Sequence, residues 1–192
     1  MSPDRIYPDE PAGPFERPPL TFDDREGREI TVEEYGETDS AHESLVETYV
    51  AFDPEDRAQG IPPSGEQRVR DWLDTILDDD CVNVVATVPD GRVVGHATLV
   101  PDVPRSESGD ADDGPHGYEL AIFVLAAYQG AGIGTHLIEG LLGAGEAADV
   151  DRVWLTVERW NHPAVALYQK VGFETSKTES FELEMSLRLD GE

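Results

Sequence analysis

The stretch YQGAGIGTHL, residues 128–137, sets Gly130, Gly132 and Gly134 at alternate positions between an apolar run and a helix-like segment. Bare backbone at the start of a helix permits a sharp turn, close packing of the helix, or a group of backbone N–H groups aimed at an anion. These explanations are compatible with one another, but only the last implies a ligand. The stretch therefore predicts a strand–turn–helix unit with a possible anion site at its turn.

Two common glycine-rich phosphate loops do not fit this stretch. A Walker A loop needs a lysine before its final Ser or Thr, whereas Gly134 is followed directly by Thr135. The dinucleotide-binding fingerprint needs a third glycine three positions after the second, and that position after Gly132 is also Thr135. Glu158 ends the next apolar run about where a ribose-binding acid would stand, so a dinucleotide-dependent oxidoreductase stays open as an alternative.

Two motifs together resemble those of the GNAT superfamily of N-acetyltransferases. Residues 129–134, QGAGIG, are similar to motif A, [Arg/Gln]-x-x-Gly-x-[Gly/Ala], and residues 161–174, NHPAVALYQKVGFE, are similar to motif B. The motif B positions are Asn161, Ala164, Leu167, Tyr168, Lys170, Gly172 and Phe173. The resemblance implies the family's fold and the transfer of an acetyl group from acetyl-CoA to a primary amine, directly in a ternary complex. A CoA or nucleotide sensor without turnover is the competing class.

The resemblance also implies where acetyl-CoA binds. Backbone N–H groups after Gln129 would hold its pyrophosphate at the helix N-terminus, where the helix dipole favours an anion. The pantetheine arm would lie in a V-shaped gap between the strands at 117–125 and 152–158, and Phe123 and Leu125 would give it main-chain contacts. The expected cofactor-binding residues are Phe123, Val124, Leu125, Gln129, Gly130, Ala131, Gly132, Ile133, Gly134, Thr135, Asn161 and Tyr168.

One position departs from the family pattern. Many relatives have Arg where this chain has Ala131, and that cation would help to hold a phosphate. We therefore expect the backbone to do more of the binding, aided by Arg159, His136 or Lys170. Asn161 is expected to contact the cofactor arm and also to serve as the N-cap of its own helix.

Two residues are candidates for the proton transfers. By resemblance, Tyr168 would lie near the sulfur and protonate the departing thiolate, although its ring could simply pack on the sheet. Glu119 is an acid within an apolar strand, where burial would raise its pKa toward a range useful for a base. A solvent-facing Glu119 with a water relay is the alternative. His96 and His116 are weaker candidates, expected at the surface or in a hairpin.

Apolar patterns predict one α/β domain with a mixed sheet. Strands are expected at 28–35, 81–88, 92–100, 117–125, 151–158 and 181–189. Helices are expected at 39–52, 64–77, 133–148 and 163–171, with Ser64 and Gln67 forming a capping box. Residues 1–26 are rich in proline and are expected to form a flexible arm that could also pack as a strap, before a single domain at 27–192.

The chain is strongly acidic, with 41 Asp and Glu against 14 Lys and Arg and a formal charge of −27. Such a charge disfavours nucleic acids and anionic membranes as partners. Adaptation to molar salt, hence a halophilic archaeal source, explains it better than attraction of a cationic substrate. A single cysteine and no signal peptide predict a cytoplasmic protein, and no Cys/His spacing suggests a metal. The expected partner is a small-molecule or peptide amine, with a homodimer possible by resemblance.

Overall fold

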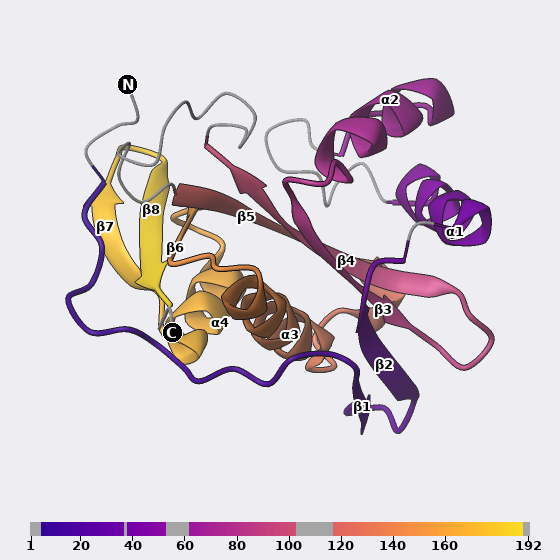
Figure 1. Cartoon of the computed structure of the whole chain (residues 1–192), viewed down its shortest axis with the longest axis horizontal. Coiled ribbons are helices and arrows are strands. Elements are labelled where there is room, and N and C mark those ends of the chain that lie inside the picture. Colours follow the sequence, from indigo (N-terminus) through magenta and orange to yellow (C-terminus); the bar gives the residue numbers. More distant parts are fainter. Residues whose placement is uncertain (1–4, 37, 53–61, 103–116, 190–192) are drawn as a thin grey trace.

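The computed structural model describes residues 5–36, 38–52, 62–102 and 117–189, and its centre is an eight-stranded sheet (Figure 1). The strand order is β1-β2-β3-β4-β5-β6-β8-β7. The strands are β1 (Leu20–Asp23), β2 (Glu29–Glu34), β3 (Val82–Thr87), β4 (Val93–Pro101), β5 (Gly117–Val124), β6 (Arg152–Glu158), β7 (Glu174–Thr178) and β8 (Glu182–Arg188). Neighbouring strands are antiparallel except β5 and β6, which are parallel. The prediction of a mixed α/β sheet is confirmed.

Helices cover both faces of this sheet. The helices α3 (Ile133–Ala147) and α4 (His162–Val171) lie on one face, and α1 (Asp39–Val50) and α2 (Glu66–Ile76) lie on the other (Figure 1). The main core lies between the sheet and α3 with α4, and a smaller core joins α1 and α2 to β3 and β4. The central strands β3, β4 and β6 are mostly buried, and strands of this kind need a helical layer on each face of the sheet to cover them.

Three local features differ from the sequence expectations. Strand β1 lies within the expected N-terminal arm, and its Phe22 pairs with Ile30 of β2. Strand β7, ETSKT, has no apolar alternation because it is an exposed edge strand that buries little. The capping box is wrong: α2 begins after Gly65 with no side-chain cap, and Gln67 donates instead to Asp71 Oδ1 at 2.9 Å.

The described part of the N-terminal segment, residues 5–19, packs as a strap (Figure 1). The Ala12 N–H donates to the Arg188 carbonyl at 2.8 Å, beside a bridge between Ala12 and Leu189. A Cβ at Gly143 of α3 would lie 2.5 Å from the Glu16 carbonyl oxygen, so the strap touches the helix backbone. The segment is thus held against the sheet edge and α3 by specific backbone contacts.

The pairing of β5 with β6 is confined to three residue pairs, which end at Glu119 and Trp154. Beyond this point β5 stays paired with β4 as far as Val124, whereas β6 stays paired with β8 as far as Glu158. The facing edges of β5 and β6 therefore separate along the second half of each strand. This loss of pairing agrees with the V-shaped gap that the resemblance implied, and the region between the separated edges is called the opening below.

Candidate active site

The glycine-rich turn uses its three glycines in two ways. Gly130 and Gly132 have φ values of +72° and +96°, and Gly132 is the N-cap of α3. This left-handed region is costly for residues with a Cβ. Gly134 instead allows close packing, because a Cβ there would lie 3.3 Å from Leu167 Cδ2 of α4. The turn and the helix contact therefore account for all three positions.

The same turn leaves its backbone N–H groups available. In the described part of the chain, no acceptor meets the N–H groups of Gly130, Ala131, Gly132, Ile133 and Gly134, whereas the Thr135 N–H donates to the Gly132 carbonyl at 3.1 Å. The available groups lie at the N-terminus of the 15-residue helix α3. Unpaired N–H groups and the helix dipole together favour a bound anion.

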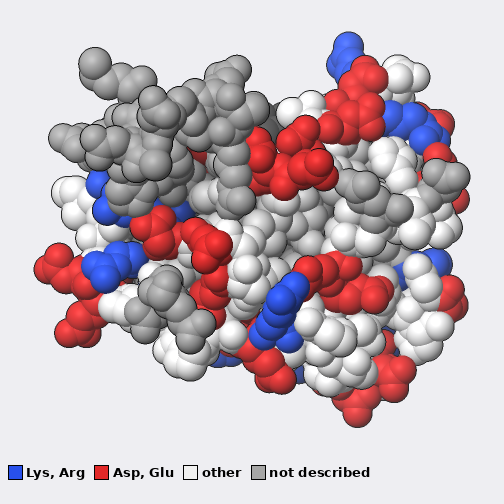
Figure 2. All heavy atoms as spheres, viewed as in Figure 1, with Lys and Arg blue, Asp and Glu red and all other residues white. Residues whose placement is uncertain are grey.

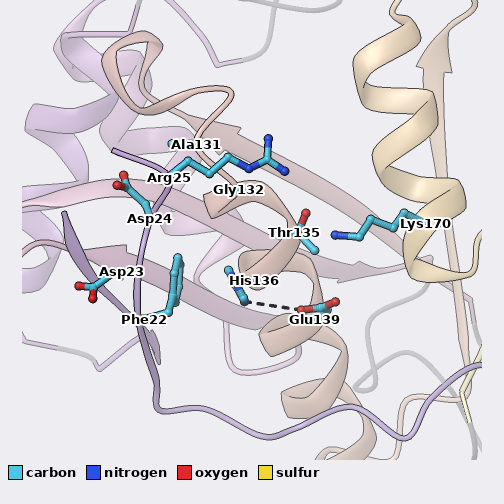
Figure 3. A pocket seen from close by; sticks show the side chains of 10 residues that line it. All are labelled: Phe22, Asp23, Asp24, Arg25, Ala131, Gly132, Thr135, His136, Glu139 and Lys170. Carbon is cyan, nitrogen blue, oxygen red and sulfur yellow. Dashed lines mark ion pairs between the residues drawn. The ribbon is translucent and has the colours of Figure 1, made fainter. Parts of the chain in front are cut away.

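A cavity of about 260 Å³ lies beside this turn (Figure 3). Arg25, from the turn between β1 and β2, and Lys170, from α4, reach toward Thr135 at the start of α3 from two different elements (Figure 3). His136 also lines the cavity, 3.6 Å from Glu139. Cations thus flank the available N–H groups.

Arg25 is held in place by contacts that the sequence did not indicate. Its backbone N–H donates to the Ala131 carbonyl at 3.1 Å, and its Nη1 donates to the Gly130 carbonyl at 3.3 Å. The neighbouring Asp24 carboxylate is buried and accepts hydrogen bonds from the Arg28 side chain and backbone. Arg25 lay in the expected flexible arm, and only recognition of the β1–β2 hairpin could have brought it to this site.

Of the three residues expected to aid the loop, Lys170 and His136 line the cavity. Arg159 does not belong to this group, because its Nη1 donates to the carbonyls of Glu179 and Ser180, both at 3.4 Å. Arg159 precedes α4, and its direction could not be read from sequence spacing.

The register of β5 corrects the expected main-chain contacts. The Leu125 N–H donates to the Val94 carbonyl at 3.0 Å, and the Leu125 carbonyl accepts from the Tyr128 N–H at 2.8 Å. Both backbone groups of Leu125 therefore have partners within the chain. Because successive peptide groups of a strand point to opposite edges, Phe123 also faces β4, while Ile122 and Val124 face the opening toward β6. The Val124 carbonyl accepts from Gln129 Nε2 at 3.0 Å, which agrees with this direction.

Asn161 stands at the start of α4, directly after β6. Its side-chain oxygen accepts from the Ala164 N–H at 3.3 Å, so the predicted N-cap is confirmed. The residue is exposed. At the other end of α4, Gly172 has a φ of +118° and terminates the helix.

Tyr168 is buried on the inner side of α4. Its ring packs against Phe173 with the centroids 5.8 Å apart and belongs to the main core. Burial raises the pKa of Tyr168 to about 12. Because this pKa is well above neutral, the hydroxyl keeps its proton at neutral pH. It makes no hydrogen bond to a described residue and can therefore donate one to a ligand. The core role of the ring and a donor role of the hydroxyl are compatible.

Glu119 lies on the face of the sheet opposite α3 and is exposed. Partial burial raises the pKa of Glu119, Arg5 opposes this shift and Asp102 adds to it. No described residue hydrogen-bonds to its carboxylate. The exposure agrees with the solvent-facing alternative, and the pKa of the carboxylate is nevertheless raised, so its role as a base stays a prediction.

His96 lies in the β3–β4 hairpin, which was one of its two expected places, but it is fully buried and not at the surface. Its Nδ1 lies 2.6 Å from Tyr49 Oη, and its Nε2 lies 3.0 Å from Asn83 Oδ1. Asn83 Nδ2 donates to Ile76, so Asn83 Oδ1 accepts from His96 Nε2–H and Tyr49 donates to Nδ1. Burial lowers the pKa of His96 to about 3. His116 lies outside the described residues.

Other chemistry finds little support among the described residues. They contain no group of three or more His, Cys, Asp or Glu side chains that could hold a metal ion. Burial, with the nearby Asp78 and Asp80, raises the pKa of Cys81 to about 11, which keeps the thiol protonated. None of the described helices has the length and apolarity needed to cross a membrane.

Comparisons with known proteins agree with this geometry. A family model described as "Acetyltransferase (GNAT) family" matches residues 39–173. L-amino acid N-acetyltransferase AaaT of Escherichia coli is 30% identical over 112 residues, which cover 56% of this chain and 62% of that protein. An N-alpha-acetyltransferase of Sulfurisphaera tokodaii is 35% identical over 95 residues, which cover 46% of this chain and 54% of that protein. The chain thus matches less than two thirds of the length of either relative.

Solved structures share the fold at low sequence identity. The GNAT domain of S. lividans PAT has a TM-score of 0.71 at 18% identity, covering 88% of this chain and 96% of that one. The protein yncA of Salmonella typhimurium, solved with its cofactor acetyl-CoA, has a TM-score of 0.61 at 16% identity, covering 85% of this chain and 95% of that one.

Proposed function

The chain belongs to the GNAT acetyltransferase family, and on this premise we propose that it transfers the acetyl group of acetyl-CoA to a primary amine, directly in a ternary complex. One observation carries the proposal: available N–H groups at the start of α3 stand beside the opening between β5 and β6. A diphosphate and a pantetheine arm need these two features next to each other. The two curated relatives, both named as N-acetyltransferases, support the same activity.

The pyrophosphate of acetyl-CoA would bind the N–H groups from Gly130 to Gly134. Arg25 and Lys170 would supply the positive charge that Ala131 lacks. The amide groups of the pantetheine arm would pair with the peptide groups of β5 that face away from β4, which are those of Ile122 and the N–H of Val124. Bound acetyl-CoA in yncA supports this class of cofactor.

The transfer itself needs one base and one hydrogen-bond donor. The amine nitrogen attacks the thioester carbonyl, a C–N bond forms, the C–S bond breaks, and the amine proton passes to Glu119, directly or through a water molecule. Tyr168 would donate a hydrogen bond to the sulfur as negative charge develops there. Because the pKa of Tyr168, about 12, exceeds that of an ordinary thiol, hydrogen-bond donation is favoured over complete proton transfer.

Titration calorimetry with acetyl-CoA and NAD, followed by a panel of amines read by release of free thiol, tests the proposal. The panel contains amino acids, polyamines and peptides with free N-termini or lysines. We expect acetyl-CoA to bind and at least one amine to release thiol. Binding without release on any amine would identify a sensor, and preferred binding of NAD would identify an oxidoreductase that uses Glu158.

We also propose that the acidic surface is an adaptation to high salt in a cytoplasmic protein. In the face shown in Figure 2, Asp and Glu are spread over many elements, and Lys and Arg stand among them in small groups. Dense like charge is tolerated when salt screens it. Stability against unfolding should rise with KCl concentration, and full stability in dilute buffer would contradict the adaptation.

A further inference from the structure

Arg5 of the N-terminal strap is buried in a cluster of charged and aromatic side chains. Its Nη1 donates to Asp102 at 3.0 Å and its Nε donates to Glu184 at 3.3 Å, and its side chain is 9% exposed. Its guanidinium carbon lies 3.4 Å from the ring centroid of Trp154, and Trp154 Nε1 donates to Asp102 at 2.9 Å. A planar guanidinium can lie flat on an aromatic ring while its edges bind two carboxylates, whereas an ammonium group has no flat surface to stack.

This cluster adjoins the candidate base. Trp154 is the cross-strand partner of Glu119, so the two side chains project from neighbouring strands on the same face of the sheet. Arg5, stacked on Trp154, therefore lies over the residue next to Glu119. Among the described residues, the charged groups that act on Glu119 are Arg5 of the strap and Asp102 after β4. The same two residues also act on Tyr7 of the strap, together with Arg152 of β6 and Glu184 of β8.

In the described part of this cluster, Arg5 pairs with the carboxylates of Asp102 and Glu184 and leaves that of Glu119 available. Asp102 and Glu184 are 14% and 17% exposed and are paired with the guanidinium, whereas no described residue hydrogen-bonds to Glu119. Without the cation, Asp102 would lose its partner, and its negative charge would act on Glu119 without opposition from Arg5.

The strap also holds Arg5 at a fixed place. Ser186 Oγ of β8 donates to the Ile6 carbonyl at 2.7 Å, and Arg188 Nη1 donates to the Asp9 carbonyl at 2.8 Å. Gly117 leaves room for this packing, because a Cβ there would lie 2.7 Å from both Asp102 Oδ2 and Tyr7 Oη. The backbone of the strap is therefore bonded on both sides of Tyr7.

We propose that the N-terminal strap is part of the active site and that Arg5 is a positioning residue, which holds Asp102 and Glu184 so that Glu119 remains the available carboxylate for the amine. The role rests on the proposed function of Glu119. The same arginine stabilises the charged form of Glu119, while Asp102 acts in the opposite direction. Neutral substitutions of Arg5 and of Asp102 should therefore shift the pKa of Glu119 in opposite directions.

A carbon-13 NMR titration of the Glu119 carboxyl, assigned with the Glu119→Gln variant, tests the inference in the full chain without cofactor or acceptor. Arg5→Met should move the midpoint upward, because the neighbouring cation is lost. Asp102→Asn, which preserves an acceptor for Trp154, should move it downward. With an amine substrate, Arg5→Met should lose more kcat/KM at pH 6 than at pH 8, and Arg5→Lys should restore part of the loss.

Arg17→Met is the matched control, because Arg17 lies on the same strap but pairs with Glu34 at the surface. It should leave the Glu119 midpoint unchanged. A lower melting temperature in Arg5→Met with an unchanged midpoint would show a purely structural role and overturn the inference. If Arg5→Met does not fold, an unchanged midpoint in Asp102→Asn overturns it. Shifted midpoints in a protein that acetylates no amine would instead refute the proposed function.

Discussion

Glu119 of β5 and Trp154 of β6 are the last residues to pair before these two parallel strands separate. The carboxylate of Glu119 therefore stands at the apex of the opening that the proposed thioester would enter. The free N–H groups at the start of α3 follow the other end of β5, after Val124. One strand thus connects the candidate base to the candidate phosphate site.

Substitution of Gly132 by Val should weaken acetyl-CoA binding at least about tenfold. Gly132 has a φ of +96°, and a side chain there would distort the turn that presents the N–H groups. Gly91→Val is the matched control, because Gly91 has a φ of +86° in a hairpin turn with open space around it. Both variants should lose about 1–3 kcal/mol of stability. Calorimetry should find weaker binding in Gly132→Val alone, and equal affinities would refute the loop assignment.

Neutralising Arg25 or Lys170 should weaken acetyl-CoA binding by about 3- to 10-fold in low salt. Both side chains flank the start of α3, and the loss should shrink as salt screens their charge. Arg92→Gln is the control, since Arg92 forms an exposed pair with Asp90 in a hairpin turn. Binding isotherms of Arg25→Gln and Lys170→Gln at several KCl concentrations measure the effect. Wild-type affinity in both variants would show that the backbone alone holds the anion.

Replacing Tyr168 by Phe should lower kcat by about 10²-fold and leave the Kd of acetyl-CoA nearly unchanged. The variant removes the hydroxyl and keeps the ring that packs against Phe173. Tyr118→Phe, a buried change on β5 that faces the main core, is the matched control. Steady-state kinetics with an amine from the panel compare the two. Undiminished turnover in Tyr168→Phe would remove the hydroxyl from the mechanism.

Stability should fall as the pH is lowered from about 6.5 toward 3, in part because of His96. Its pKa is about 3 in the folded protein and 6.5 ordinarily, so in this window the unfolded state binds a proton that the folded state does not. The contribution is complete above pH 6.5 and is lost toward pH 3. In His96→Gln the slope of unfolding free energy against pH should be smaller by up to about 1.4 kcal/mol per pH unit.

Denaturant unfolding at a series of pH values measures that slope. His162→Gln, a change at an exposed histidine, should leave the slope as it is in the wild type. An equal slope in His96→Gln and the wild type would mean that His96 does not titrate as a buried group.

Local sequence patterns determined much of the fold and the chemical class of the site. Gly130 and Gly132 specify a left-handed turn before a helix, Asn161 and Gly172 mark the ends of α4, and the apolar runs predict the buried strands. These features depend on residues only a few positions apart, so the chain reveals them without its fold. The polar edge strand β7 buries too little to leave such a pattern.

Only the tertiary structure decided which groups meet at the site. The register of β5 on β4 turns Val124, and not Leu125, toward the opening, because a shift of one residue reverses every peptide group. Arg5 and Arg25 lie 114 and 94 residues before Glu119, yet one lies beside Trp154 and the other beside Ala131. Sequence spacing holds no information about such distant contacts, since they arise from packing of the whole sheet.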